Sequence, residues 1–123
     1  MVGCGNSKLS EEMAVDGYSR ITNIDISSNV IEKMSAVYSN RFAFQEYQII
    51  DATRMAYRDE SFDVCIDKGT FDALACGGDP EVPIRLLSEM MRVCRTATLI
   101  VTSGTPEKRI HYFEKVSSKI DYK

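Results

Sequence analysis

The sequence predicts an α/β fold with a doubly wound, mostly parallel sheet, and two features of the 123-residue chain indicate it. First, short β-branched or apolar runs alternate with stretches whose apolar residues recur every three or four positions. Second, a glycine turn near the amino terminus is followed, 20 residues after Gly5, by Asp25, which is the spacing of a strand, turn, helix and second strand. Parallel neighbours need crossover connections, so the carboxyl ends of the strands should share one edge.

The composition is that of one ordinary domain, with 44% hydrophobic residues, and no second domain is expected. The net charge is −3 and the 15 basic residues are scattered, so a nucleic-acid partner is not expected. Four well-separated cysteines form no Cys-x-x-Cys pair, which predicts reduced thiols, a cytoplasmic protein and no metal site. No apolar run approaches the roughly 20 residues of a membrane span, so no membrane partner is expected either.

The glycine turn, Gly3-Cys4-Gly5, would let the backbone approach a ligand because neither glycine carries a β-carbon. By itself the turn is a weak signal, since Lys8 stands where a dinucleotide fingerprint has its third glycine. Only two residues precede Gly3, so the strand that should lead into the turn is almost entirely missing. Ser7 could cap the helix that follows, and Gly17 is placed to end it.

The run from Ile21 to Ile26 reads as the next strand, and Asp25 at its end could accept hydrogen bonds from a ribose. A solvated strand-end residue is the alternative for Asp25. After Ser27 or Ser28 as a cap, an amphipathic helix with a core-facing stripe is predicted. The residues of that stripe are Val30, Ile31, Met34, Val37 and Tyr38.

Three more strands are predicted, at 44–50, 62–67 and 97–101. The first of these ends at Asp51-Ala52. The second has a buried apolar centre with an acid at each end, and the third should be buried on both faces. The exit at Asp67-Lys68-Gly69-Thr70 should therefore share an edge with the earlier ligand loops.

Two further helices are predicted, one with Pro83 in its first turn and one opened by Pro106. On the first helix Leu87, Met90, Met91 and Cys94 should form one face. The second carries Ile110, Phe113, Ser117 and Ile120. His111, the only histidine, is expected on a helix surface rather than in proton transfer.

With these segments in place, the chain resembles the class I, seven-strand S-adenosylmethionine-dependent methyltransferases. Within them it resembles the branch that contains elongation-factor-1-alpha lysine methyltransferases and the methyltransferase linked to endothelin-converting enzyme. The segment most specific to that branch is Asp67-Lys68-Gly69-Thr70-Phe71-Asp72-Ala73-Leu74. The other matching segments are Val2–Ser7, Asn23–Ser27, Asp51–Thr53, Phe62–Val64, Thr102-Ser103 and Arg109–Tyr112.

The resemblance implies a Rossmann-like fold, S-adenosyl-L-methionine as cofactor and a protein lysine as acceptor. The implied cofactor-binding residues are Gly3, Cys4, Gly5, Asn6, Ser7, Asp25, Ile26, Ser27, Asp51, Ala52, Thr53, Asp67, Lys68 and Gly69. Asp67 is the candidate catalytic residue, and Thr70 and Asp72 are the candidates for contact with the substrate. Either acid could orient the amine or take its proton, but a helix cap or a hydrogen-bond anchor is an equal alternative.

The sequence also departs from that family. No acid precedes the first glycine, Cys94-Arg95-Thr96 replaces the usual proline-glycine-glycine turn, and the first strand and the last two strands are largely missing. Residues 1–123 are therefore predicted to be one partial domain. In the implied strand order the first strand lies at the centre, so its loss should cause self-association, low stability and weak cofactor binding.

Two other functions compete with a methyltransferase. A nicotinamide-dependent dehydrogenase would share the glycine turn and the ribose acid, but the sequence has no Tyr-x-x-x-Lys pair. A non-catalytic fragment that retains part of the sheet and acts as a binding module is the stronger rival.

Overall fold

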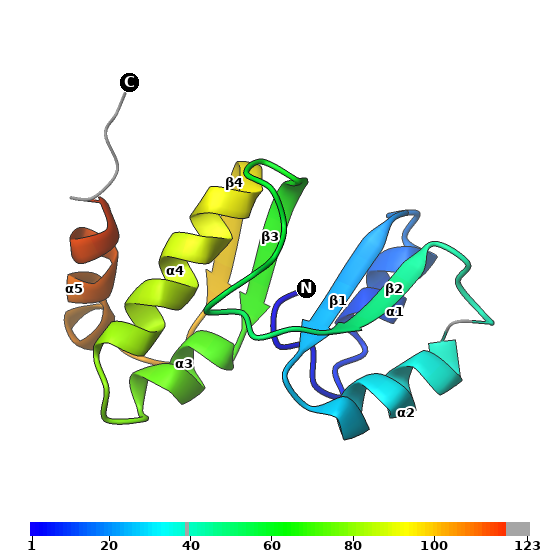
Figure 1. The fold of residues 1–123 in the computed structure, drawn as a ribbon, viewed down its shortest axis with the longest axis horizontal. Helices are drawn as coiled ribbons and strands as arrows, with labels where there is room; N and C mark the ends of the chain where they lie inside the picture. The colour runs from blue at the N-terminus through cyan, green and yellow to red at the C-terminus, as the bar shows by residue number, and fades with distance from the viewer. Residues whose placement is uncertain (39, 118–123) are drawn as a thin grey trace. The chain divides into compact units, whose positions relative to one another are not determined.

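The computed structural model describes residues 1–38 and 40–117 and divides into two compact units, Met1–Ala52 and a second unit that begins at Thr53. Each unit contains a two-stranded parallel sheet with helices packed on it (Figure 1). The predicted α/β class with parallel strands is confirmed. That residues 1–123 form one partial domain stays a prediction.

The first unit contains α1 (Leu9–Val15), β1 (Ile21–Asp25), α2 (Ser28–Tyr38) and β2 (Gln45–Ile49). The two strands are parallel and paired over their whole length, from Ile21 opposite Gln45 to Asp25 opposite Ile49. Both predicted strands are therefore confirmed.

The first residues of the chain run parallel to β1 and hydrogen-bond with it. Val2 makes a single parallel bridge with Ile24. The Ile24 amide donates to the carbonyl of Met1 at 2.9 Å, and the Cys4 amide donates to the carbonyl of Ile24 at 2.9 Å. The terminal ammonium of Met1 donates to the carbonyl of Thr22 at 2.7 Å. Met1 and Val2 thus form parallel hydrogen bonds with the edge of β1 opposite β2. The largely missing first strand was predicted at this position.

The apolar stripe of α2 is narrower than predicted. Ile31, Met34 and Tyr38 are buried as expected, but the side chain of Val37 is 55% exposed. Val37 was therefore wrongly assigned to the core. A helix turns by about 100° per residue, so Val37 lies well away from the line through Met34 and Tyr38.

A buried polar network joins α1 to the strands, and the sequence reasoning missed it. The Ser10 hydroxyl donates to Oδ1 of Asn23, whose side chain is fully buried. Nδ2 of Asn23 donates to Oε1 of Gln45 at 3.4 Å and to the carbonyl of Glu46 at 3.3 Å. Gln45 in turn donates to the carbonyl of Ser10 at 2.7 Å and accepts from the Tyr47 hydroxyl at 2.8 Å. Because every member is satisfied, the network fixes α1, and with it the preceding glycine turn, against the sheet.

The second unit contains β3 (Phe62–Lys68), α3 (Thr70–Ala75), α4 (Glu81–Val93), β4 (Cys94–Val101) and α5 (Pro106–Ser117). β3 and β4 are parallel, with a register shift between Phe62 and Val64 and with Lys68 opposite Val101. β4 follows α4 with no intervening turn, at the position where Cys94-Arg95-Thr96 departs from the family pattern.

The core of this unit forms where α4 meets α3, α5 and the strands. Leu86, Leu87 and Met90 are at most 1% exposed, and the ring of Phe71 packs edge-on against Tyr112 at 5.7 Å between centroids. The predicted helix opened by Pro106 is confirmed as α5. Its buried residues are Tyr112 and Val116, whereas Ile110 is 51% exposed. Ile120 lies outside the described residues.

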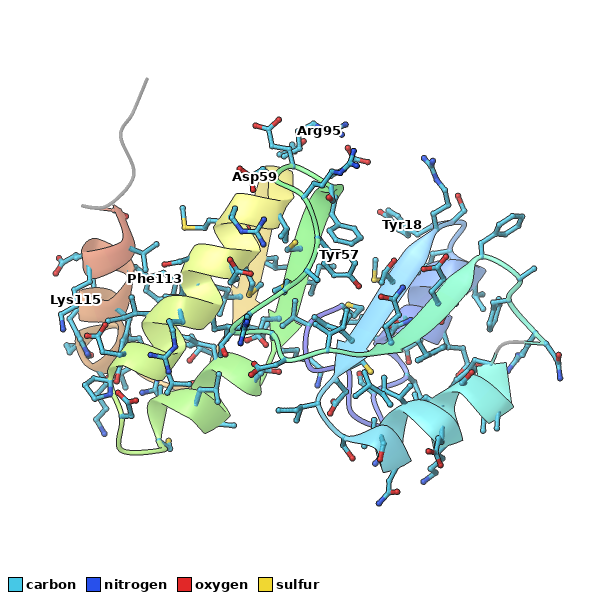
Figure 2. The ribbon with its side chains drawn as sticks, viewed as in Figure 1. Tyr18, Tyr57, Asp59, Arg95, Phe113 and Lys115 are labelled. Carbon is cyan, nitrogen blue, oxygen red and sulfur yellow. The ribbon has the colours of Figure 1, made fainter. Side chains whose placement is uncertain are left out.

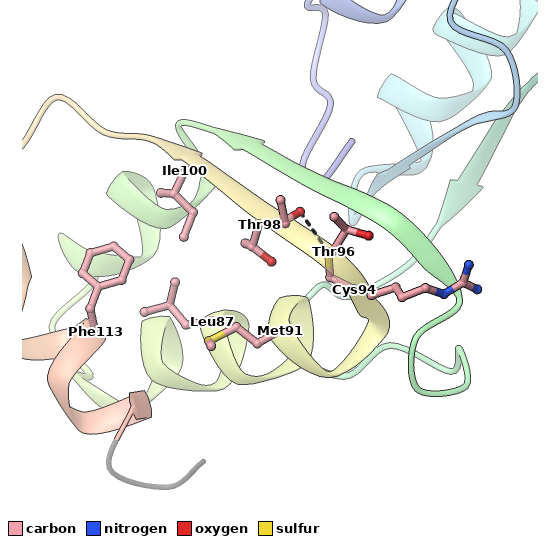
Figure 3. Close-up of a pocket in the computed structure, with 9 residues that line it drawn as sticks. Leu87, Met91, Cys94, Thr96, Thr98, Ile100 and Phe113 are labelled. Carbon is pink, nitrogen blue, oxygen red and sulfur yellow. Dashed lines mark hydrogen bonds between the residues drawn. The ribbon is translucent and has the colours of Figure 1, made fainter. Parts of the chain in front are cut away.

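The described helices of the second unit cover one face of its sheet. α4 packs on the face that carries Thr98 and Ile100 (Figure 3). On the other face Val64, Leu99 and Val101 are 51%, 54% and 48% exposed. The prediction that 97–101 is buried on both faces and 62–67 is a buried apolar strand is therefore wrong. Such burial requires helices on both faces, and no described helix of this unit packs on the second one.

Candidate functional site

The glycine turn has the conformation that a close ligand requires. Gly3 and Gly5 have φ angles of 55° and 51°, in the left-handed region that glycine adopts readily. A β-carbon at Gly5 would have no atom of the chain within 4 Å, so open space lies over the turn. The cap position of α1 falls on Lys8 rather than on the predicted Ser7, and the Ser7 hydroxyl accepts from the amide of Leu9 at 3.2 Å just before the helix. Gly17, with φ 96°, lies just past the end of α1.

Asp25 is tied directly to that turn. Its Oδ2 accepts from the amide of Gly5 at 2.9 Å, and its Oδ1 accepts from the amide of Ser27 at 3.0 Å. Each carboxylate oxygen can accept two hydrogen bonds, so each retains capacity for one more. A pair of acceptors 20 residues from a glycine turn fits the two hydroxyls of a ribose. The hydroxyl of Ser27 also accepts from the amide of Val30, so Ser27 caps α2.

Cys4 contributes backbone rather than thiol chemistry. Its side chain is 5% exposed. Burial, with a smaller contribution from the charge of Asp25, raises the pKa of Cys4 to about 11. The thiol is therefore neutral at physiological pH and unsuited to act as a nucleophile.

The remaining predicted residues of the first unit lie close to Asp25 in the fold. The amide of Ile50 donates to the carbonyl of Asp25 at 3.0 Å, which holds the exit of β2 beside the end of β1. Asp51 and Ala52 follow directly on that exit. Ile26 is 72% exposed and Asn6 is exposed, so both side chains are accessible.

In the second unit, Asp67 holds the start of α3. Its side chain is fully buried, Oδ1 accepts from the amide of Thr70 at 3.1 Å, and Oδ2 accepts from the amide of Phe71 at 3.1 Å. Burial raises the pKa of Asp67, and hydrogen bonds from the Phe71 amide and from the side chain and amide of Thr70 partly offset that rise. This geometry is that of the hydrogen-bond anchor that the sequence left open as an alternative. Lys68 and Gly69 are exposed, and Gly69 has a left-handed φ of 102°.

Asp72 is more heavily engaged than Asp67. Its Oδ1 accepts from the hydroxyl of Thr102 at 2.5 Å and from Nε of Arg109 at 3.1 Å. Its Oδ2 accepts from the amide of Ser103 at 2.6 Å and from the hydroxyl of the same residue at 2.9 Å. The Thr102 hydroxyl, followed by the Ser103 amide, holds the pKa of Asp72 well below its usual range. Asp72 is thus a poor proton acceptor, and its partners were not predicted as functional residues.

Two residues of α4 organise the segment that precedes β3. Arg92 donates to the carbonyls of Tyr57 and Met55 at 2.8 and 2.9 Å and to Asp59 at 2.8 Å. Glu89 accepts from the amide of Met55 at 2.7 Å and from Nε of Arg92 at 2.7 Å. Tyr57 and Asp59 are labelled on this segment in Figure 2. The segment continues from Thr53, one of the predicted cofactor-binding residues.

A cavity of about 360 Å³ lies between α4, β4 and α5 (Figure 3). None of the predicted site residues lines it, so it is distinct from the candidate site. Its lining residues are Leu87, Met91, Cys94, Arg95, Thr96, Ala97, Thr98, Ile100 and Phe113. Among the described helices, none is long and apolar enough to cross a membrane.

Each unit therefore assembles its own share of the predicted residues. A glycine turn bonded to an acid at the end of the next parallel strand defines the class of α/β proteins that bind a nucleotide-type cofactor at the carboxyl edge of the sheet. Residues 1–102 match the family model described as a methyltransferase domain, and the chain belongs to that family.

Curated relatives and solved structures agree with this family. The chain is 43% identical over 93 residues to the zebrafish (Danio rerio) eEF1A lysine and N-terminal methyltransferase, covering 76% of this chain and 14% of that protein. It is 31% identical over 124 residues to bovine (Bos taurus) EEF1A lysine methyltransferase 4, covering 92% and 48%. The chain thus spans less than half the length of each.

Among solved structures, a SAM-dependent methyltransferase from Methanosarcina mazei is 26% identical with a TM-score of 0.70, covering 92% of this chain and 55% of that one. A second, from Methanococcus maripaludis, shares the fold with a TM-score of 0.65 at 19% identity. The fold is therefore that of the Rossmann-like class I methyltransferases, and S-adenosyl-L-methionine is the cofactor of this family.

Proposed function

We propose that this chain binds S-adenosyl-L-methionine and acts in the methylation of a protein lysine. The observation that carries the cofactor part is the hydrogen bond from the Gly5 amide to Asp25, which joins an open left-handed turn to an acid with remaining acceptor capacity. The acceptor part is supported by the names of the relatives, which are methyltransferases of eEF1A lysine.

In this proposal each segment has one task. The backbone of Gly3–Ser7 faces the methionine part, and Asp25 accepts from the ribose hydroxyls with Ile26 and Ser27 beside it. Asp51 and Ala52 flank the adenine, and Thr53 follows them as a further cofactor-binding residue. When bound, the cofactor supplies a methyl group on a sulfonium centre for in-line transfer to a nucleophile. The exit at Asp67–Gly69 borders cofactor and acceptor.

The acceptor lysine must lose its ammonium proton before it attacks, and a group of the chain can orient the amine or take that proton. Asp67 is the candidate for that task, and Thr70 and Asp72 are the candidates for contact with the substrate. The two amide bonds of Asp67 support an anchoring contribution as well, because the start of α3 depends on them.

Calorimetry with S-adenosyl-L-methionine tests the cofactor part. Asp25→Ala should weaken binding by about 1.5 to 3 kcal/mol, roughly 10- to 150-fold, because charge-assisted bonds to two hydroxyls are lost. Asp16→Ala is the matched control, since Asp16 is an exposed acid of the same unit at the end of α1, and its affinity should equal that of the unchanged chain. Equal affinity of the Asp25 variant would remove Asp25 from the site. Binding of NAD in preference would favour a dehydrogenase.

The acceptor part is tested with labelled cofactor and purified eEF1A. Label should appear in the protein at a lysine, located by mass spectrometry of its peptides. Label confined to nucleic acid or to small molecules would contradict a protein acceptor.

A second candidate function is a non-catalytic module that associates with itself through its incomplete sheet. The separate two-stranded sheets and the exposed Val64, Leu99 and Val101 favour it. Light scattering should then give a mass above that of one chain, and a monodisperse monomer would exclude it. We further propose a cytoplasmic location, which imaging of a tagged chain can check.

A further inference from the structure

The segment after β4, residues 102–104, begins at the same sheet edge as the exit of β3. Lys68 is paired with Val101 in parallel register, so the next residues of both strands leave the sheet side by side. Gly69 and Thr70 continue from one strand, and Thr102 continues from the other. In an open parallel sheet this is the edge at which ligands bind.

Asp72, on the first turn of α3, accepts hydrogen bonds from residues of that segment. Hydrogen bonds reach its carboxylate from the hydroxyl of Thr102 and from both the amide and the hydroxyl of Ser103. The hydroxyl of Thr102 also accepts from the amide of Gly104 at 3.1 Å. The Asp72 carboxylate thus binds Thr102 and Ser103 directly, and the Thr102 hydroxyl extends this order to Gly104.

Arg109 on α5 completes this cluster. Its Nε and its NH2 nitrogen each lie 3.1 Å from Oδ1 of Asp72, and its side chain is 13% exposed. The guanidinium also lies over the ring of Phe71, 5.8 Å from its centroid. A β-carbon at Gly104 would lie 2.3 Å from Nε of Arg109, so a side chain at residue 104 would displace the arginine from the position in which it contacts Asp72.

We propose that Asp72 and Arg109 are a positioning pair that fixes residues 102–104 beside the exit of β3 so that the segment meets the acceptor protein. This role rests on the proposed function, since it assigns the segment to the acceptor of the same reaction. Asp72 then acts on the acceptor through the loop it holds, and proton transfer falls to another group.

Two variants of the full chain separate this role from plain stability. Asp72→Asn keeps the shape but removes the charge that the four donors share. Gly104→Ala keeps every charge and displaces Arg109 by contact alone. The matched control is Asp63→Asn, because Asp63 accepts from Arg95 at 3.0 Å in another pair that bridges β3 and β4, at the amino ends of the strands.

Hydrogen exchange at 102–104 and steady-state methyl transfer to eEF1A are measured for all four proteins. Both variants should exchange these amides about tenfold faster, since the loss of a bond to a charged group corresponds to roughly that factor or more. The KM for the acceptor should rise about tenfold with an unchanged dissociation constant for S-adenosyl-L-methionine, and Asp63→Asn should match the unchanged chain.

Each outcome decides one claim. Unchanged exchange in both variants, or an acceptor KM equal to that of the unchanged chain, would overturn the positioning role while leaving the proposed function intact. Equal losses of cofactor and acceptor binding would also overturn it, because they indicate general destabilisation. No transfer by the unchanged chain would overturn the proposed function and, with it, the acceptor role of the pair.

Discussion

Replacing Asp67 with asparagine distinguishes an anchor from a catalytic acid. The carboxylate accepts from two amides, at Thr70 and Phe71, in a fully buried position. An asparagine oxygen can serve one of them, whereas its NH2 group would face the other. A buried amide without an acceptor costs about 1 to 3 kcal/mol. Loss of a buried charge offsets part of this cost, so we expect the free energy of unfolding to fall by about 1 to 2 kcal/mol.

Urea unfolding at neutral and acidic pH measures this change. Asp79→Asn is the control, because both contacts of the Asp79 carboxylate are exposed: it accepts from the amide of Glu81 at 2.9 Å and lies 4.0 Å from Arg85. This variant should change stability by less than about 0.5 kcal/mol. Burial raises the pKa of Asp67 in the folded state above its value in the unfolded state. The protonated side chain therefore contributes to the free energy of unfolding fully below the unfolded-state pKa, and this contribution is lost as pH rises through the folded-state pKa. The cost of Asp67→Asn should therefore grow on acidification. Unchanged stability together with lost methyl transfer would refute the anchor.

Two further predictions concern ion pairs of the second unit. Arg92→Met should lower the free energy of unfolding by about 2 to 4 kcal/mol, because the bonds of Arg92 to Glu89 and to the segment before β3 are lost together. The midpoint of urea unfolding measures this loss. Arg85→Met is the control, since the exposed Arg85 lies 4.0 Å from its acid, and a loss equal to that of Arg92→Met would contradict the argument. The pKa values of Glu89 and Asp72 are lowered, so their stabilisation is present above the unfolded pKa and lost as pH falls. Acid titration of Glu89→Gln should show a shallower loss, and an identical curve would exclude this linkage.

The elements were predictable because their signals are local. Spacing alone located β1, α2, β2 and β3, and the distance from Gly5 to Asp25 predicted their proximity. Burial was less predictable, because an apolar run such as that of β4 has the same pattern whether one face or both are covered. The number of helices that pack on a sheet is a property of the whole fold. Leu99 therefore looked like a core residue and is half exposed.

The roles of the three acids show the same limit at the site. Sequence spacing places Asp25, Asp67 and Asp72 at strand or helix ends, but it does not tell how many donors reach each carboxylate. Asp25 accepts one amide on each oxygen and is partly exposed, so it can still accept a ligand hydroxyl. Asp67 also accepts one amide on each oxygen, and the Thr70 side chain adds a further hydrogen bond, but its carboxylate is fully buried and is shielded from solvent. Each oxygen of Asp72 already accepts two bonds, which fills its acceptor capacity and leaves its charge to order the loop around it.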